Sequence, residues 1–251
     1  EDIPTQHIDD TGFTTVPAFE APRTFQGNKT KVRLMHLDSE AEILWREGDE
    51  EIWSKYEEEI WVNKNVELYA YAVAEGVSSK TIKHEIVKID HDWTVEYATP
   101  YSHQYAAAGP NTLVDGLYGG DEYRTGDWQG FYATPMQATI DLGESFDIEG
   151  MSLGCVQDIR PWIWLPESVD FLVSQDGINF SLFNHVEHDI AEDDYEKQVF
   201  RFKTNIKSEG IVSARYVRVI TNPRGLIPEW HLGAGFDRWT FVDEWSISFV
   251  K

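Results

Sequence analysis

The stretch at residues 168–180 is Ser-Val-Asp-Phe-Leu-Val-Ser-Gln-Asp-Gly-Ile-Asn-Phe. Apolar and polar residues alternate at its start, which predicts a strand with one buried face. Asp176-Gly177 is a dipeptide that favours a tight hairpin turn, so the chain is expected to reverse there. The same combination recurs at 138–142, where an alternating run ends at Gly143-Glu144. These segments predict antiparallel β-structure.

Outward from this hairpin, short alternating runs with turn signals continue to the end of the chain, and helical periodicity is scarce. They predict antiparallel strands at 94–97, 137–142, 148–155, 168–174, 199–202, 215–220 and 240–250. In the last run Trp245, Ile247 and Phe249 alternate with serines, so one face is expected to be buried. About eight such strands predict a jelly-roll β-sandwich over residues 93–251.

A smaller set of strands precedes this sandwich. Alternating runs occur at 31–35, 42–46, 59–62, 66–72 and 81–89. They predict a small β-sandwich at 21–91, of a size that is marginal alone and sufficient beside a neighbour. Residues 1–20 are polar, carry spaced prolines and lack a period, which predicts a loose leader. The predicted fold class is all-β, with a boundary near 90–95.

Composition limits the partners. The 251 residues include 21 Lys+Arg and 44 Asp+Glu, which gives a net charge of −23. A chain this acidic repels phosphate groups, so nucleic acid and anionic membrane surfaces are not expected partners. No stretch approaches the ~20 apolar residues of a membrane helix, so no membrane insertion is expected. The single cysteine, Cys155, excludes a disulfide framework and a multi-cysteine metal site.

Several motifs follow one another along residues 93–251. They are 111–131 (Asn-Thr-Leu-Val-Asp-Gly to Trp-Gln-Gly-Phe), 138–143 (Ala-Thr-Ile-Asp-Leu-Gly), 169–180, 214–219 (Ala-Arg-Tyr-Val-Arg-Val) and 241–244 (Phe-Val-Asp-Glu). This series resembles the discoidin, or coagulation factor V/VIII C-type, fold, which includes the family 32 carbohydrate-binding modules. The forms at 128–131 and 230–235 (Trp-His-Leu-Gly-Ala-Gly) look like the version appended to bacterial β-hexosaminidases of the chitobiase type.

Residues 25–90 resemble the small immunoglobulin-like domain that precedes this module in such enzymes. The usual Tyr-Thr-Thr-Asp-Gly-Ser hairpin is replaced by Leu-Trp-Arg-Glu-Gly-Asp at 44–49. The resemblance implies the accessory region of a larger, secreted glycoside hydrolase, or a stand-alone relative, since neither part leaves room for a catalytic domain. The expected location is extracellular, periplasmic or on the cell surface, with any signal peptide removed. The expected partners are glycans of galactose or N-acetylhexosamine type, and a catalytic domain in a longer chain.

The loop before the last strand holds the first binding candidates, Trp230, His231 and Arg238. A tryptophan in a glycine-rich loop can stack its ring on the C–H face of a sugar, while histidine and arginine bond the hydroxyls. The alternative is that Trp230 plugs the loop into the core and Arg238 pairs with a surface acid.

A second group of candidates includes Arg160 and Trp162. Trp162 and Trp164 share parity, so in an extended segment they would face one side as a platform for a sugar, with Arg160 as a hydroxyl partner. The alternative places both tryptophans in the core, which is favoured for Trp164. Trp128 and Arg224 are further candidates for sugar contacts.

The resemblance also implies a structural calcium ion. Discoidin-type modules often hold Ca²⁺ between the loop after the first strand and a carboxylate near the C-terminus, which corresponds here to Asp115, Asp121 and Glu244. Calcium takes six to eight oxygen ligands, which aspartates and glycine carbonyls can supply. The alternative is that Asp115-Gly116 is only a turn and that Glu244 is solvated.

The sequence contains no His-Glu-x-x-His, no Gly-x-Ser-x-Gly and no phosphate-binding loop. The predicted function is therefore non-catalytic glycan recognition through loop aromatics. A structural or protein-docking module would share the fold. A hydrolase in its own right would need two carboxylates brought together in space.

Overall fold

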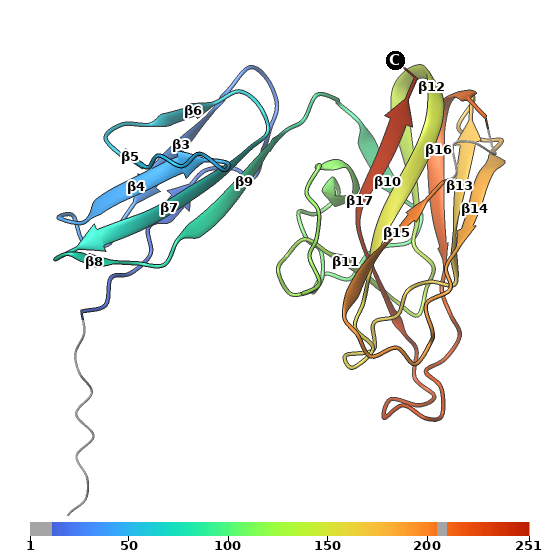
Figure 1. Cartoon of the computed structure of the whole chain (residues 1–251). Helices are drawn as coiled ribbons and strands as arrows, with labels where there is room; N and C mark the ends of the chain where they lie inside the picture. Colours follow the sequence, from blue (N-terminus) through green and yellow to red (C-terminus); the bar gives the residue numbers. More distant parts are fainter. Residues whose placement is uncertain (1–11, 205–209, 251) are drawn as a thin grey trace, which may run out of the picture. The chain divides into compact units, whose positions relative to one another are not determined.

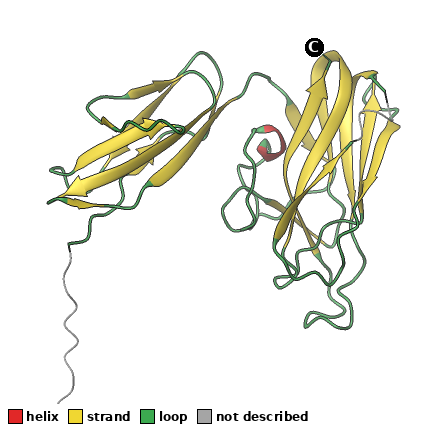
Figure 2. Ribbon diagram, in the orientation of Figure 1, coloured by secondary structure: helices red, strands yellow, loops and turns green. Residues whose placement is uncertain are grey.

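The structure, a computed structural model, describes residues 12–204 and 210–250. Over these residues the chain consists of β-strands and loops, apart from one short 3-10 helix, η1 (Thr112–Val114) (Figures 1 and 2). The all-β prediction is confirmed. No helix in the described ranges is long and apolar enough to cross a membrane.

The chain divides into two compact units, Glu1–Asp90 and His91–Lys251. Residues 1–11 of the predicted leader lie outside the described residues. Ala18–Glu20, also assigned to that leader, instead forms strand β1, because Phe19 pairs with Leu34 of β3 (Thr30–Met35). The first unit thus begins before residue 21.

The first unit is a small two-sheet sandwich. One sheet has the order β1-β3-β6, with β6 at Ile60–Val62. The other has the order β2-β9-β7-β4-β5, with β8 paired to β7; the strands are β2 (Thr24–Phe25), β4 (Glu42–Glu47), β5 (Ser54–Lys55), β7 (Val66–Ala74), β8 (Val77–Ser78) and β9 (Ile82–Lys88). Both sheets contribute to one core, which includes Phe25, Val32, Val62, Leu68 and Ile86. An immunoglobulin-like relationship for this unit stays a prediction.

The second unit contains a sheet of order β11-β17-β12-β16-β13-β14, with β10 and β15 added against β12. Its strands are β10 (Thr94–Tyr97), β11 (Gln129–Tyr132), β12 (Gln137–Gln157), β13 (Ser168–Ser174), β14 (Ser181–Glu187), β15 (Gln198–Lys203), β16 (Val212–Asn222) and β17 (Trp239–Phe249). All pairings among them are antiparallel. The sequence did not predict β11 and β14.

Strand β12 belongs to both layers of this unit. Its first part pairs with β10 and β16, and its last part pairs with β15 and β17. The sequence predicts two strands here, separated at Gly143-Glu144. The structure joins them into one strand, whose register against β16 shifts between Asp141 and Phe146. Gly143 has a φ of +86°, a left-handed conformation that glycine adopts without strain.

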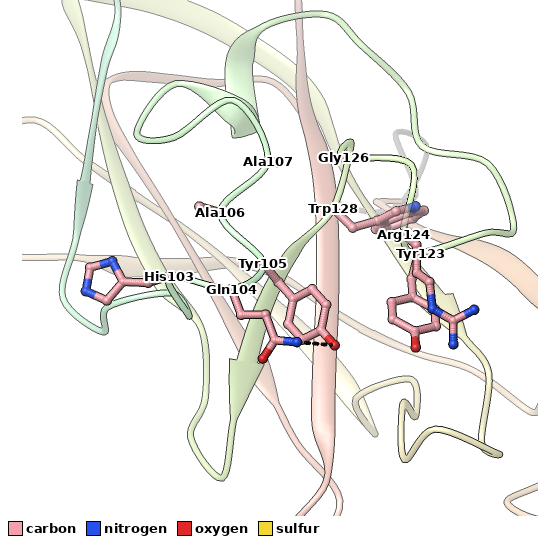
Figure 3. Close-up of a pocket in the computed structure, with 9 residues that line it drawn as sticks. All are labelled: His103, Gln104, Tyr105, Ala106, Ala107, Tyr123, Arg124, Gly126 and Trp128. Carbon is pink, nitrogen blue, oxygen red and sulfur yellow. Dashed lines mark hydrogen bonds between the residues drawn. The ribbon is translucent and has the colours of Figure 1, made fainter.

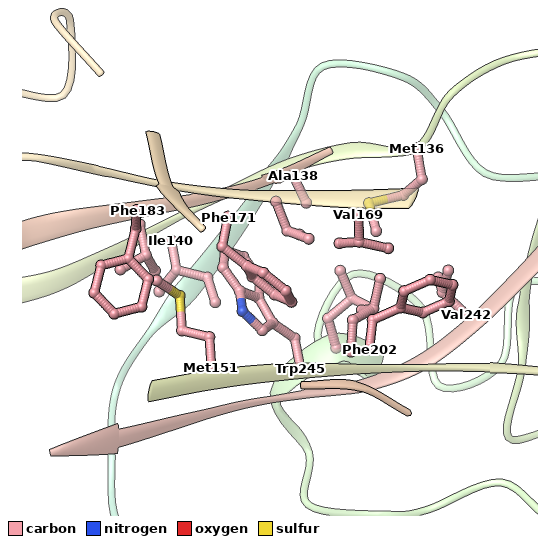
Figure 4. Packing of buried hydrophobic residues seen from close by; sticks show 14 of the residues in the cluster. Met136, Ala138, Ile140, Met151, Val169, Phe171, Phe183, Phe202, Val242 and Trp245 are labelled. Carbon is pink, nitrogen blue, oxygen red and sulfur yellow. The ribbon is translucent and has the colours of Figure 1, made fainter. Parts of the chain in front are cut away.

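The core of the second unit lies between these two layers. Side chains from the first part of β12 and from β13 meet side chains from its last part and from β17 (Figure 4). The central members are fully buried and include Ala138, Ile140, Val169, Phe171, Leu153, Phe202, Val242 and Trp245. Such burial contributes about 1.5–3 kcal/mol for each large apolar side chain. One continuous apolar cluster therefore joins these strands of the two layers.

A β-bulge interrupts β17 near its middle. Leu153 pairs with Trp245 and Cys155 pairs with Val242, so Gly154 alone lies opposite Asp243 and Glu244. Glycine is required there, because a Cβ on Gly154 would lie 1.7 Å from Oδ1 of Asp243. The bulge thereby accommodates a carboxylate with no exposed surface inside the sandwich.

Gly154→Ala is expected to destabilise the second unit by about 3 kcal/mol, because the added methyl displaces the buried Asp243 carboxylate and its partners. Urea unfolding monitored by tryptophan fluorescence measures the change. Gly225→Ala is the matched control, since a Cβ there meets no atom within 4 Å. Equal stabilities of the two variants would contradict the role assigned to Gly154.

Candidate functional site

Three loops meet at one end of the second unit, opposite the C-terminus (Figure 1). They connect β12 to β13 (158–167), β14 to β15 (188–197) and β16 to β17 (223–238). The strand registers place them together, since Gln157 pairs with Gln198 and Ser168 pairs with both Glu187 and Asn222. Loops at one end of a sandwich are a common place for binding sites.

Two of these loops bring two exposed aromatic rings side by side. Trp230 is 47% exposed and Tyr195 is 43% exposed, and their ring centroids are 6.1 Å apart in an edge-to-face arrangement. Arg160, from the third loop, donates a hydrogen bond from Nη1 to the carbonyl oxygen of Tyr195 (2.9 Å), and its guanidinium lies 5.3 Å from that ring. We call Trp230, Tyr195 and Arg160 the aromatic face. It combines ring surface with free guanidinium donors, which are the groups that recognise sugars.

A second aromatic pair joins the β12–β13 loop to the β16–β17 loop. Trp162 stacks on Phe236 with ring centroids 5.3 Å apart and planes 18° apart. The Trp162 ring lies against Gly233, where a Cβ would come within 2.6 Å of the indole nitrogen. Trp162 has a φ of +73°, a strained backbone conformation for a bulky residue, in a tight turn closed by Asp158 and Ile163. The predicted parity with Trp164 does not hold, because the segment turns instead of extending.

His231 is buried and packs against the rings of the aromatic face. It is only 7% exposed, and its Nδ1 accepts a hydrogen bond from the Gly233 amide (3.1 Å). Its ring contacts those of Tyr195, Trp230 and Trp164 at centroid distances of 5.2–6.4 Å. The prediction that His231 bonds sugar hydroxyls is therefore replaced by a supporting role.

Arg238 is buried too and joins two of the loops. Its Nη2 donates to Oε1 of Glu192 (2.6 Å) and to the carbonyl oxygen of Leu226 (2.7 Å). Its guanidinium lies 4.7 Å from the ring of Trp164, which is buried as favoured from the sequence. The alternative stated above for Arg238, pairing with an acid, agrees with this geometry.

The remaining candidates lie away from the aromatic face. Trp128 is 1% exposed and donates from its indole nitrogen to the carbonyl oxygen of Gly120 (3.0 Å), so it anchors a loop to the core. Arg224 is half-buried and lies 3.5 Å from Nε2 of His188. Arg224 therefore contacts His188 of the β14–β15 loop, and in the part of the chain that the structure describes no contact joins it to the rings of Trp230 or Tyr195.

Two of the three predicted calcium ligands lie near each other. Oε2 of Glu244 accepts from the Gly116 amide (2.9 Å), and Oδ1 of Asp115 accepts from the Leu117 amide (2.9 Å). Burial, with the nearby charges of Asp115 and Asp243, raises the pKa of Glu244 to about 8. Asp121 is exposed, and within residues 12–204 and 210–250 no group of three His, Cys, Asp or Glu side chains is placed to hold a metal ion. The structure thus does not bring Asp121 to the other two carboxylates.

Sequence reasoning missed Tyr195 and Phe236. Tyr195 follows an acidic run, Glu192-Asp193-Asp194, which favours a solvated loop. The signal that could have found both residues is an aromatic side chain in a segment without strand periodicity, where core packing does not require it.

No protein-family model matches the chain, and no curated protein matches it. Solved structures with a similar fold include three sugar-related proteins. The C-terminal domain of a chitobiase from Bacteroides fragilis has 17% identity and a TM-score of 0.37, covering 64% of this chain and 96% of that chain. A Clostridium perfringens family 32 carbohydrate-binding module in complex with GalNAc-β-1,3-galactose has 14% identity and a TM-score of 0.36, covering 63% and 95%. A fucolectin from striped bass serum has 14% identity and a TM-score of 0.40, covering 64% and 50%.

Arg238→Met is expected to lower the stability of the second unit by about 2 kcal/mol, since the Leu226 carbonyl and Glu192 lose their charged partner. Amide exchange should accelerate at Ile227 and Gly235, whose amides bond within the β16–β17 loop. Arg160→Met, at an exposed position, is the matched control and should change stability by less than about 0.5 kcal/mol. An Arg238 variant as stable and as protected as that control would refute the supporting role.

Proposed function

We propose that the second unit is a non-catalytic carbohydrate-binding module that holds glycans on the aromatic face. The observation that carries this proposal is the pair of exposed rings, Trp230 and Tyr195, fixed beside Arg160 by buried His231. Exposed aromatic surface in a rigidly supported loop needs a partner to cover it.

The chemistry of the aromatic face suits a sugar ring. The C–H face of a pyranose packs on an indole or phenol ring, and the nitrogens of Arg160 that do not bond Tyr195 can donate to hydroxyls. The β14–β15 loop beside it carries Asp189, Glu192, Asp193 and Asp194, which disfavours anionic sugars. Neutral glycans that end in galactose or an N-acetylhexosamine are therefore the proposed ligands, with weak single-site affinity.

The proposed setting is the accessory region of a secreted glycoside hydrolase of the chitobiase or β-hexosaminidase type. Its support is the resemblance of the motifs at 128–131 and 230–235 to those of such enzymes. In this setting the module tethers a catalytic domain to its substrate, outside the cell or at its surface. The chain by itself is then expected to turn over no chromogenic glycoside.

Docking of a protein is the second candidate function. Leu232 is fully exposed, and Leu226 and Phe236 are also exposed on the loop that carries Trp230. Clustered apolar side chains of this kind also occur at protein interfaces. A folded protein that binds no glycan would favour this function.

Trp230→Ala is expected to weaken glycan binding by about tenfold or more, because the ring that stacks on the sugar is lost. A glycan array followed by calorimetry with the best ligand measures the effect. The melting temperature should change by less than about 2 °C, since Trp230 is half exposed.

Trp61→Ala is the matched control for this experiment. Trp61 is 55% exposed and lies on β6 of the first unit, so its loss should leave glycan binding unchanged. A blank array from the folded wild-type chain, or a Trp230 variant that binds as well as the Trp61 variant, would overturn the proposed function.

We also propose a structural calcium site at Asp115 and Glu244. Its support is the approach of two buried carboxyl groups to one glycine-containing loop, together with the raised pKa of Glu244, whose ionised form a bound cation would favour. Backbone carbonyl oxygens of the loop would have to complete the six to eight ligands that calcium takes. Asp121 is left out of this proposed set.

Calcium at millimolar concentration is expected to raise the melting temperature of the EDTA-treated chain by about 5 °C, because the ion binds the folded state alone. Differential scanning calorimetry with calcium, magnesium or EDTA measures the shift. Glu244→Gln should abolish the shift, whereas Asp121→Asn should preserve it. A melting temperature that does not respond to calcium would remove the site from the proposal.

A further inference from the structure

A cleft of about 480 Å³ lies between two segments of the second unit that precede β11, and its lining residues are His103, Gln104, Tyr105, Ala106, Ala107, Tyr123, Arg124, Gly126 and Trp128. Figure 3 shows these two segments facing each other across the opening. The volume falls within the ~300–1,000 Å³ typical of small-molecule sites. None of the aromatic-face residues lines it.

The walls of the cleft are aromatic and held in place. The rings of Tyr105 and Tyr123 lie 5.9 Å apart, edge to face, and both pack against buried Phe241 at 4.8 and 5.4 Å. The amide of Gly130 donates to the carbonyl oxygen of Tyr105 (3.0 Å), which fixes that segment to β11. Tyr105 is half-buried, so part of its ring remains available to a ligand.

The backbone at the rim is strained. Ala107 has a φ of +46°, a left-handed conformation that is uncommon for residues other than glycine. Non-glycine residues in such conformations carry backbone strain and cluster at ligand-binding positions. The strained backbone at Ala107 therefore supports a binding site here independently of the cleft volume.

Each polar side chain that lines the cleft can donate a hydrogen bond, and Arg124 is a donor alone. Arg124 is exposed, with its guanidinium 4.7 Å from the Tyr123 ring, and His103 and Gln104 are also exposed. Nε2 of Gln104 donates to the hydroxyl of Tyr105 (3.2 Å) (Figure 3). Among the residues that the structure describes, no aspartate or glutamate lines the cleft, although the whole chain contains 44 of them.

The nearest acidic side chains already have partners. Glu122 lies 3.6 Å from Arg124 and also pairs with Lys197 (3.1 Å), and Asp127 accepts from the Thr125 hydroxyl (2.8 Å). Lys197 holds the pKa of Glu122 below its usual range, so this carboxylate stays ionised with its own cation. The Arg124 guanidinium makes one long contact to Glu122 through Nη1 (3.6 Å). Its other N–H groups can bond the carboxylate of a ligand.

We propose that this cleft is a second sugar site, which binds a uronic acid residue of an acidic glycan. The pyranose ring would pack on Tyr105, the sugar carboxylate would pair with the planar fork of Arg124, and Gln104 and His103 would bond hydroxyls. This site goes beyond the proposed function, because it uses different residues and selects an anionic sugar that the acidic loop beside the aromatic face disfavours.

The test is a calorimetric and NMR titration of the full chain with a trisaccharide of galacturonic acid, in EDTA and at 0.1 M salt. A neutral galactose trisaccharide is the matched ligand. We expect saturable binding of the uronate in the millimolar range, weaker by about tenfold in Arg124→Gln and by less in Arg124→Lys, which keeps the charge without the fork. The exposed position of Arg124 leaves the melting temperature of both variants unchanged.

Trp230→Ala separates this site from the aromatic face. Uronate binding should persist in that variant. A failure of the proposed glycan binding at the aromatic face would therefore leave uronate binding at the cleft unchanged. Three results would each overturn the inference: equal affinity of the Trp230→Ala variant for the neutral trisaccharide and the uronate, wild-type affinity in Arg124→Gln, or loss of uronate binding in Trp230→Ala.

Discussion

The second unit depends on one strand that serves two layers. The first part of β12 buries Ala138 and Ile140 against β13 and β16, and its last part buries Leu153 against the opposite layer. Because a single strand fixes both layers, its register also sets where the strands that pair with it begin and end. The loop that follows Gln157 is thereby brought to the same end as the loops that follow β14 and β16.

Those loops are held in shape by the buried side chains of His231 and Arg238. His231 packs under Tyr195 and Trp230, and Arg238 joins Leu226 to Glu192 over the Trp164 ring. Aromatic rings held in this way lose little conformational entropy when a ligand covers them. Such preorganisation favours the proposed glycan binding, and the rings are supported by residues that the sequence suggested as ligands themselves.

Some of the acidic side chains are buried inside the second unit, among them Asp243 and Glu244. The β17 bulge opposite Gly154 directs Asp243 and Glu244 toward the loop at 116–119, where each accepts a hydrogen bond from a glycine amide. Burial raises the pKa of Asp243 to about 6 even though Arg201 pairs with it. Arg201 pairs with Asp243 (3.0 Å), and burial raises the pKa of Glu244 to about 8, so the proposed calcium ion would favour the ionised form of Glu244.

The sequence by itself determined the all-β class and the buried faces of the strands, because alternation along a strand follows from its two-residue repeat. The hairpin at Asp176-Gly177 was predictable for the same local reason, while β14 was missed because its apolar residues Leu182, Phe183 and Val186 do not alternate with polar ones. Only the tertiary structure decided that His231 and Arg238 are buried and that Tyr195 is displayed. Loop segments have no repeat, so the direction of each side chain is set by contacts with residues far away in the sequence, as between Tyr195 and Arg160.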